Sequence, residues 1–275
     1  MFRTRPLLLA IAVSAVWPLS AQDPRQIVKE AVQTELDAGT NDHSHWIYFE
    51  IDQRPERTVK QWVAQAQHLS LNRVVERNGQ PVSEAQQRQE MTDFINDTRA
   101  QAKQRKSGEH DDEQAEELTK MLPDAFIWTL QSQTDQDLVL HFKPNPGFHP
   151  SDIEARVFAS MEGEMAVDRR LHRIATLKGH LTRDIKIGFG LLGQLDEGGT
   201  FDIERRELTP GIWQITETHV HIQGRALIFK TISENEDDLK SHFERIDAST
   251  STSQALSVLF LQVSEPGKEQ ASHGH

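Results

Sequence analysis

Residues 154–232 read EARVFASMEGEMAVDRRLHRIATLKGHLTRDIKIGFGLLGQLDEGGTFDIERRELTPGIWQITETHVHIQGRALIFKTI, and the pattern within this run predicts the architecture of the whole chain. Short segments of strand-like composition alternate with turn signals at the spacing of a meandering antiparallel sheet. One sheet, rather than several domains, is the simplest structure for such a series. We therefore predict an α+β fold built on one strongly curved antiparallel sheet.

The chain before this run supplies an amphipathic helix and more strands. Asp23 is placed to cap a helix that begins at Pro24, and apolar residues recur on one face of it as far as Leu36. Three β-rich segments follow, at residues 45–52, 57–65 and 69–76. The apolar runs 126–130 and 138–142 alternate as the two arms of a hairpin do, and we expect all of these in the same sheet.

A helical insertion is expected at residues 83–122, where apolar residues are sparse but recur near the helical period. A first helix should run from Ser83 to about Arg105 and break at Ser107-Gly108. A second, acidic helix should follow and stop at Pro123. Together with the N-terminal helix, these segments would cover one face or the mouth of the sheet.

The N-terminal residues 1–21 have the pattern of an export signal. Two arginines precede an apolar core at residues 7–16, and Leu19-Ser20-Ala21 is a suitable cleavage site. The apolar core is too short to span a bilayer, so we expect no transmembrane anchor after signal removal. The remaining chain divides into a curved-sheet domain, residues 22–233, and a C-terminal extension, residues 234–275, whose end should be disordered.

Charge and cysteine content narrow the function classes. The 275 residues carry 30 basic and 42 acidic side chains, a net charge of −12, which becomes 28 minus 42, or −14, without residues 1–21. Such an acidic surface argues against nucleic acid as a partner, because the phosphate backbone requires basic surface. The chain has no cysteine, which excludes disulfides, thiolate metal sites and lipid acylation. We expect a periplasmic or secreted protein that is not itself a lipoprotein.

One glycine-rich motif resembles a dinucleotide-binding turn. Residues 188–193, GFGLLG, fit the pattern G-x-G-x-x-G and follow a strand-like segment. A phosphate-binding turn must open a long helix, whereas residues 194–200 contain two more glycines and lead into another strand. We interpret the glycines as a bend in the sheet, and we expect no cofactor.

Histidines and catalytic motifs give no definite site. His219 and His221 would lie on the same face of one strand, which makes them weak candidates for metal ligands, but no third ligand can be identified. Alternatively, the two histidines occupy exposed positions on a half-solvated sheet, or they form a pH-dependent surface. The chain lacks both the G-x-S-x-G and the H-E-x-x-H pattern. We therefore expect no catalytic residues and no enzyme activity.

Large aromatic side chains are distributed over the predicted strands. On a curved sheet such residues either fill the concave face or line an apolar hollow there. Five of them are our candidate cavity-lining, ligand-binding residues: Trp46, Trp62, Trp128, Phe189 and Trp213.

The meander at residues 155–187 and the closing run GGTFDIERRELTPGIWQITETHVHIQG, residues 198–224, resemble the bacterial outer-membrane lipoprotein-sorting proteins, the Lol-type lipoprotein carrier superfamily. The resemblance covers roughly residues 46–232 and lies in the rhythm of strands and turns, including the entry Pro210-Gly211-Ile212-Trp213 to a late strand. It implies an unclosed antiparallel β-barrel wrapped on helices, with an apolar cavity for acyl chains and no enzyme activity. The chain departs from that family in its helical insertion and its acidic net charge. It also has no cysteine, which excludes the lipid-anchored receptor of that family.

Three function classes remain. The first is a non-enzymatic envelope protein that binds or carries an apolar ligand such as a lipid or a lipoprotein acyl chain. The second is an envelope interaction or scaffold protein with a filled core, no small ligand and a transient envelope partner. The third is an enzyme of unknown type, which no motif supports.

Overall fold

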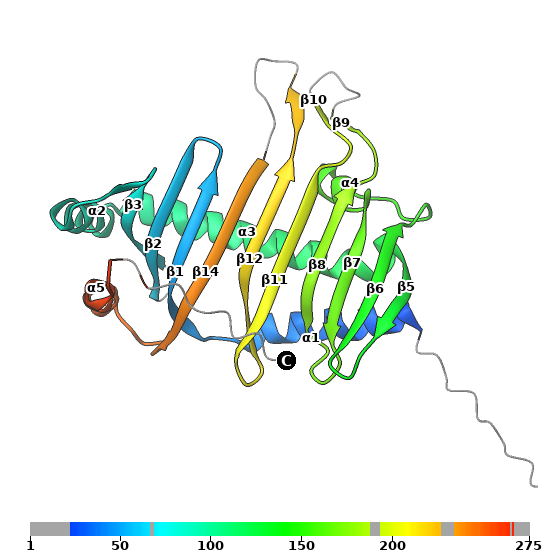
Figure 1. Ribbon diagram of the computed structural model, residues 1–275, viewed down its shortest axis with the longest axis horizontal. Coiled ribbons are helices and arrows are strands. Elements are labelled where there is room, and N and C mark those ends of the chain that lie inside the picture. Colours follow the sequence, from blue (N-terminus) through cyan, green and yellow to red (C-terminus); the bar gives the residue numbers. More distant parts are fainter. Residues whose placement is uncertain (1–22, 67–68, 188–192, 227–233, 265, 267–275) are drawn as a thin grey trace, which may run out of the picture.

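The computed structural model describes residues 23–66, 69–187, 193–226, 234–264 and 266. The predicted export signal and the last nine residues lie outside this part of the chain. The described residues form one large antiparallel sheet, a small second sheet and five helices (Figure 1). The helices are α1 (Pro24–Asn41), α2 (Glu84–Asn96), α3 (Thr98–Ala125), α4 (Ile153–Phe158) and α5 (Thr252–Leu261).

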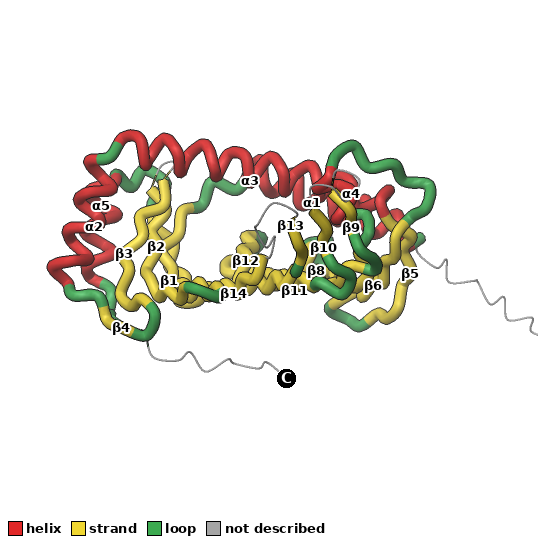
Figure 2. Tube along the Cα trace, turned by 90° about the horizontal axis from the view of Figure 1, so that it is seen from above, coloured by secondary structure: helices red, strands yellow, loops and turns green. Residues whose placement is uncertain are grey.

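The large sheet has eleven strands in the order β4-β3-β2-β1-β14-β12-β11-β8-β7-β6-β5, and it is not closed. Both of its ends curl toward α3, which crosses from the β3 end to the β5 end (Figure 2). The α+β class and one large, curved antiparallel sheet are therefore confirmed, whereas three short strands of the run predicted to belong to it form a separate small sheet. The strands are β1 (His45–Arg54), β2 (Arg57–Ala66), β3 (Leu69–Arg77), β4 (Gln80–Pro81), β5 (Phe126–Gln133), β6 (Asp137–Pro144), β7 (Met161–Asp168), β8 (Ile174–Leu181), β11 (Thr200–Thr209), β12 (Ile212–Ile222) and β14 (Glu234–Ile246).

The strands that flank the glycine-rich motif in the sequence belong to the small sheet. Its three strands, in the order β13-β10-β9, are β9 (Ile185–Ile187), β10 (Gly193–Leu195) and β13 (Gly224–Ala226). Residues 188–192 of the motif lie outside the described part, but Gly193 begins a strand and not a helix. A phosphate-binding turn would need a helix at this point.

The strand β14 corrects the predicted domain boundary. Residues 234–275 were expected to form an extension beyond the sheet, but β14 lies between β1 and β12 in its centre. The run ENEDD at residues 234–238 reads as solvated loop because it is almost entirely charged. Pairing with two neighbouring strands satisfies its backbone groups, so the composition does not prevent a strand here.

The helical insertion breaks at a different place from the one predicted. The chain ends α2 at Asn96, and Asp97 caps α3 by accepting the N–H groups of Arg99 and Ala100, both at 2.9 Å. The helix α3 then continues through Gly108, where the prediction placed the break, and includes Pro123. A glycine within a helix costs only about 1 kcal/mol, which the capped and anchored helix tolerates.

The chain makes a tight turn at Asn78-Gly79, directly after β3. Asn78 has φ 51° and Gly79 has φ 75°. Two successive positive φ angles are those of a tight hairpin turn. The chain accordingly makes one short return strand, β4, before it enters α2.

Two apolar cores lie on the sheet. The first gathers α1, the end of α3 and strands β5 to β8 around side chains such as Val28, Phe126 and Met165. The second lies at the other end, where α2 and α5 contact strands β1 to β3 around Trp62 and Leu71. In Figure 2, α2 and α5 lie on the outer side of the curled β3 end, whereas α3 crosses the concave side.

The middle of α3 is exposed on all sides. From Lys106 to Glu117 nearly every side chain is exposed, and six of the twelve are acidic. The helix is held at its ends: Gln104 exchanges two hydrogen bonds, of 3.1 and 3.0 Å, with the backbone of Ser70 in β3, and the indole N–H of Trp128 donates to the carbonyl of Leu122 at 3.0 Å. It is a bridge over the concave face and not a packed core helix. Within the described residues, no helix is long and apolar enough to span a bilayer.

Candidate functional site

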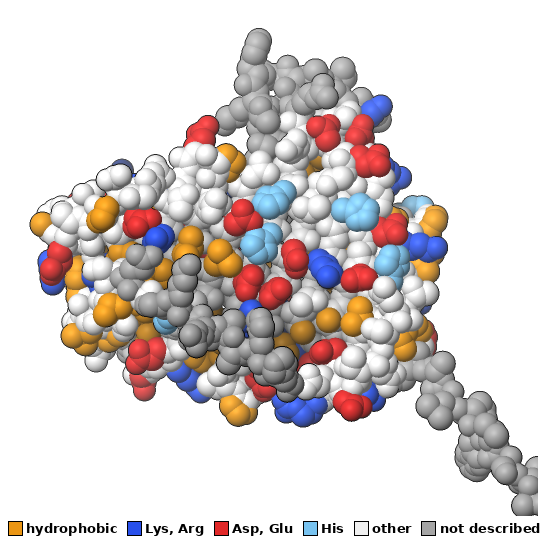
Figure 3. Space-filling model, viewed as in Figure 1, with side chains coloured by type: hydrophobic (Ala, Val, Ile, Leu, Met, Phe, Trp, Pro, Cys, Tyr) orange, Lys and Arg blue, Asp and Glu red, His pale blue; other side chains and the backbone are white. Residues whose placement is uncertain are grey.

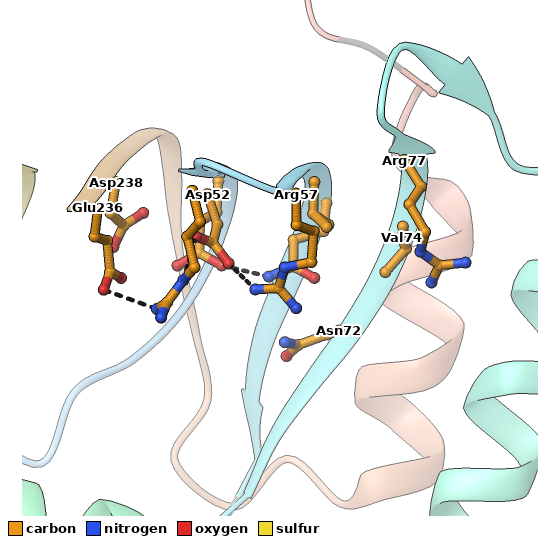
Figure 4. Close-up of a pocket in the computed structure, with 11 residues that line it drawn as sticks. Asp52, Arg57, Asn72, Val74, Arg77, Glu236 and Asp238 are labelled. Atoms are coloured by element: carbon orange, nitrogen blue, oxygen red, sulfur yellow. Dashed lines mark hydrogen bonds and ion pairs between the residues drawn. The ribbon is translucent and has the colours of Figure 1, made fainter. Parts of the chain in front are cut away.

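An open hollow of about 330 Å³ lies on the sheet at its β3 end (Figure 4). Asp52 in β1 pairs with Val59 in β2 and with Asp238 in β14, so these three side chains share one face. Phe49 and Trp62 point to the other face, into the core beneath α5. The hollow therefore lies on the concave face, which α3 crosses. Its lining consists of Glu50, Asp52, Arg54, Arg57, Val59, Gln61, Asn72, Val74, Arg77, Glu236 and Asp238.

A network of ion pairs organises the lining. Asp52 is only 8% exposed and accepts hydrogen bonds from the guanidinium groups of Arg54, at 3.1 Å, and Arg57. Arg54 also pairs with Glu236 at 2.8 Å. Figure 4 shows Asp52, Arg57, Glu236 and Asp238 on one side of the hollow and Asn72, Val74 and Arg77 of β3 on the other, with the Arg77 side chain turned away from Arg57. The walls are thus charged and amide-bearing, and not apolar.

Two carboxyl groups approach each other next to this network. Burial raises the pKa of Glu50, and the negative charge of Asp238 raises it further. The Nζ of Lys240 lies 2.9 Å from Asp238 Oδ2 and 3.8 Å from Glu50 Oε1. The other oxygen of Asp238, Oδ1, is buried and has no hydrogen-bond partner among the described residues. The single positive charge of Lys240 is therefore shared by two carboxyl groups and does not balance both of them.

An aromatic group adjoins the hollow. Tyr48 precedes Glu50 by two residues in β1, so both point to the concave face. Its ring stacks on that of Phe243 at 5.2 Å between centroids, and Trp46 meets Phe243 edge to face at 6.1 Å. The Nζ of Lys240 lies 5.9 Å from the Tyr48 ring. We call Trp46, Tyr48 and Phe243 the aromatic group. Tyr48 and Phe243 are partly exposed next to the charged hollow, whereas Trp46 is buried, with 3% of its surface exposed.

The structure does not bring the five predicted cavity residues together. Trp46 belongs to the aromatic group, whereas Trp62 lies in the core beneath α5 and donates its indole N–H to the carbonyl of Val263 at 2.8 Å. Trp128 lies in the other core, against Phe126 and Phe142. Trp213 is 9% exposed in β12, and its indole nitrogen has no hydrogen-bond partner among the described residues. Phe189 lies outside the described residues.

The weak metal candidates lie on the opposite face of the sheet. His219 Nδ1 is 2.6 Å and His221 Nε2 is 3.1 Å from the same oxygen of Asp237. Figure 3 shows several histidines between acidic side chains on this outer face. No group of three or more metal-binding side chains with suitable geometry occurs in the part of the chain that the structure describes. The cluster is a set of histidine–carboxylate pairs.

The sequence analysis did not predict the hollow, although the sequence contains a pattern that indicates it. Glu50, Asp52 and Arg54 occupy alternate positions of β1, and Asp238 and Lys240 do so in β14. Charges at every second position of a strand share one face of the sheet. On a face expected to be a concave core, such a row indicates a polar site.

Comparisons with protein families, with curated proteins and with solved structures find no match for this chain. The functional argument therefore rests on the geometry of the concave face.

Proposed function

We propose that this protein is a non-enzymatic, exported protein of the bacterial envelope that binds a lipid or lipoprotein on the concave face of its sheet. One observation carries the proposal: an open, charged hollow lies beside the partly exposed aromatic side chains of Tyr48 and Phe243 on the face that α3 crosses. A ligand that fits both surfaces has a polar head and an apolar part. Lipids and acylated proteins have this character.

The geometry also narrows where the apolar part of such a ligand would lie. The β5 to β8 half of the concave face is occupied by α1 and the end of α3, whose side chains fill the first core. The aromatic group, which is next to the hollow, is the apolar surface that remains beside the polar walls. We therefore place the acyl chain along Tyr48 and Phe243, on the concave face that α3 crosses.

The export signal predicted at residues 1–21 and the missing cysteine support a periplasmic or secreted location. The large antiparallel sheet is unclosed, which is one feature that the resemblance to Lol-type carriers implies, and this supports the proposal. Both lines of support lead to the same class of protein, a carrier or binder of lipid in the envelope.

Native mass spectrometry of the protein purified from its own cells tests the proposal. We expect an added mass that is extracted into organic solvent and is reduced in Phe243→Ser, which removes apolar surface from the aromatic group. His221→Ala is the matched control, because His221 lies on the outer face. A clean mass for the mature protein, together with no uptake of an apolar fluorophore by the wild type, would exclude lipid binding.

A second candidate function, an envelope scaffold without a small ligand, is favoured by the filled half of the concave face and by the exposed acidic span of α3. For a scaffold we expect the clean mass just described. Replacement of the acids Asp111, Asp112 and Glu113 would then impair the assembly of a partner, which a lipid binder would not require.

A further inference from the structure

We propose that the hollow recognises a zwitterionic group, with an ammonium at its acidic floor and a phosphate or carboxylate at its arginine rim. The proposal rests on the function proposed above and names the part of the ligand that the hollow selects. It follows from the arrangement of charges within the cavity, and phosphoethanolamine head groups and free amino acids share the required chemistry.

The acids and the arginines of the lining lie at different depths. The side chains of Asp52, Asp238 and Glu50 are 11%, 13% and 14% exposed. The side chains of Arg57, Arg54 and Arg77 are 52%, 45% and 41% exposed. The hollow therefore has a negative floor and a positive rim. An ion of one sign would meet repulsion at one of these levels, whereas a zwitterion is complementary to both.

The charges at the floor do not balance. Four carboxyl groups line the hollow, from Glu50, Asp52, Glu236 and Asp238, and three cations pair with them, from Arg54, Arg57 and Lys240. The third arginine of the lining, Arg77, pairs with Glu90 outside the lining. Among the described residues, Glu50 and Asp238 share a single cation, Lys240, which leaves one carboxyl group in excess at this point. The unpartnered Oδ1 of Asp238 locates that excess between Asp238 and Glu50.

Lys240 shows that an ammonium group suits this environment. Its Nζ contacts Asp238 Oδ2 and faces the ring of Tyr48. A carboxylate combined with an aromatic ring is a common binding site for ammonium groups. A ligand ammonium next to Glu50 and Asp238 would neutralise the negative charge that Lys240 leaves unbalanced.

The rim has donors for an anion. Arg57 contacts Asp52 through one terminal nitrogen, and a guanidinium carries five N–H donors. Planar guanidinium groups bind phosphate and carboxylate oxygens in pairs of hydrogen bonds. The volume of about 330 Å³ is at the lower end of the range for ligand sites, which suits a head group and not a whole lipid.

Binding should release a proton. Burial and the charge of Asp238 raise the pKa of Glu50, so its carboxyl group holds a proton to a higher pH than an ordinary glutamate. An ammonium at the floor favours the ionised carboxylate and lowers this pKa again. The heat of binding near pH 5 should therefore change with the ionisation enthalpy of the buffer, and Glu50→Gln should abolish this dependence.

Isothermal titration calorimetry of the delipidated protein with four soluble probes tests the proposal. Glycerophosphoethanolamine carries both charges, glycerophosphoglycerol only the anion, ethanolamine only the ammonium, and β-alanine is a free amino acid. We expect glycerophosphoethanolamine to bind at least about tenfold more tightly than the two singly charged probes, because each loses one charge-assisted contact. Equal binding of glycerophosphoglycerol and glycerophosphoethanolamine, or binding of neither zwitterion, would overturn the proposal.

Substitutions in the hollow test whether glycerophosphoethanolamine binds there. Asp238→Asn and Arg57→Gln should each weaken glycerophosphoethanolamine about tenfold or more, whereas Asp237→Asn, one residue away on the outer face, should leave it unchanged. Thermal unfolding checks that each variant is folded. Unchanged binding in both hollow variants would refute the assignment of the site.

The probes also separate this proposal from the proposed function. A copurified lipid without binding of either zwitterion would refute the head-group site and leave lipid binding intact. Binding of β-alanine as tight as that of glycerophosphoethanolamine, with a clean native mass, would support the zwitterion site and refute lipid binding.

Discussion

The carboxylate of Glu35 in α1 and the guanidinium of Arg173 form two parallel hydrogen bonds, each 3.0 Å long, across 138 residues of sequence. The Glu35 side chain is 9% and the Arg173 side chain 7% exposed. Glu35 also accepts the backbone N–H of Ile174 at 2.8 Å and pairs with Arg205. Burial acts to raise the pKa of Glu35, but the hydrogen bond from Arg173 and the charge of Arg205 outweigh it and hold the pKa below its ordinary value. This contact fixes α1 on the sheet.

Glu35→Gln should destabilise the protein by about 3 kcal/mol or more, because it leaves the buried Arg173 and the partly buried Arg205 without their counter-charge. Urea unfolding at pH 7 measures the loss. The control Glu30→Gln, whose partner His172 is 3.8 Å away and exposed, should change stability by less than about 0.5 kcal/mol. Because the folded pKa of Glu35 is depressed, its contribution is present above the unfolded pKa of about 4.3 and is lost as the pH falls through the folded value. A Glu35→Gln loss that is the same at pH 3 and at pH 7 would contradict this.

Gly163→Ala should destabilise the sheet strongly. A Cβ at Gly163 would lie 2.0 Å from the carbonyl oxygen of Lys178 in β8, so a strand would have to move. We expect a loss of at least about 2 kcal/mol in urea unfolding. Gly39→Ala is the control, because a Cβ at Gly39 has nothing within 4 Å and the residue lies in α1. That substitution should be neutral or stabilise by up to about 1 kcal/mol, and equal losses in the two variants would refute the close approach.

Arg73→Met should release the C-terminal helix α5. The guanidinium of Arg73 donates to the carbonyls of Leu259, at 2.7 Å, and Gln262, at 2.9 Å, and to the side chain of Gln87. Removing these charge-assisted bonds from a residue that is 5% exposed should cost about 2–4 kcal/mol. Hydrogen exchange should show faster exchange in α5 than in α1. Unaltered protection of α5 would show that its apolar contacts alone hold it.

His219 should titrate at a higher pH than an ordinary histidine. The hydrogen bond to Asp237 raises its pKa, and the charges of Asp237, Glu217 and Asp202 raise it further against the opposing effect of desolvation. The second imidazole on Asp237 is that of His221. NMR titration of the His219 ring should give a pKa above about 6.5, which Asp237→Asn should lower. A midpoint unchanged by that substitution would contradict the pairing.

The same shift has a consequence for stability. A histidine whose folded pKa is raised stabilises the fold below the unfolded pKa of about 6.5, and this contribution is lost as the pH rises through the folded pKa. Because the pair is about one-third exposed, we expect an effect of less than about 1 kcal/mol. His219→Ala should remove that part of the pH dependence, which begins above about pH 6.5.

Local patterns predicted most of the strands. The hairpin of β5 and β6 pairs Trp128 with Phe142 and Leu130 with Leu140, the alternation visible in the sequence. The strands β1, β2 and β3 begin where expected, because alternating apolar side chains must face a core. The break at Asp97 was missed because Ser107-Gly108 is the stronger breaker by composition, whereas a cap depends on side-chain geometry.

The amino-acid sequence by itself determined the α+β class, the first helix and the faces of most strands, because propensity and periodicity act over a few residues. Only the tertiary structure decided that β14 lies between β1 and β12, since the partner of a strand is chosen by contacts far along the chain. That choice brings Asp238 beside Glu50 and Lys240 beside Tyr48. The concave face is therefore filled under α1 and open and charged beside β14, a division that no local pattern encodes.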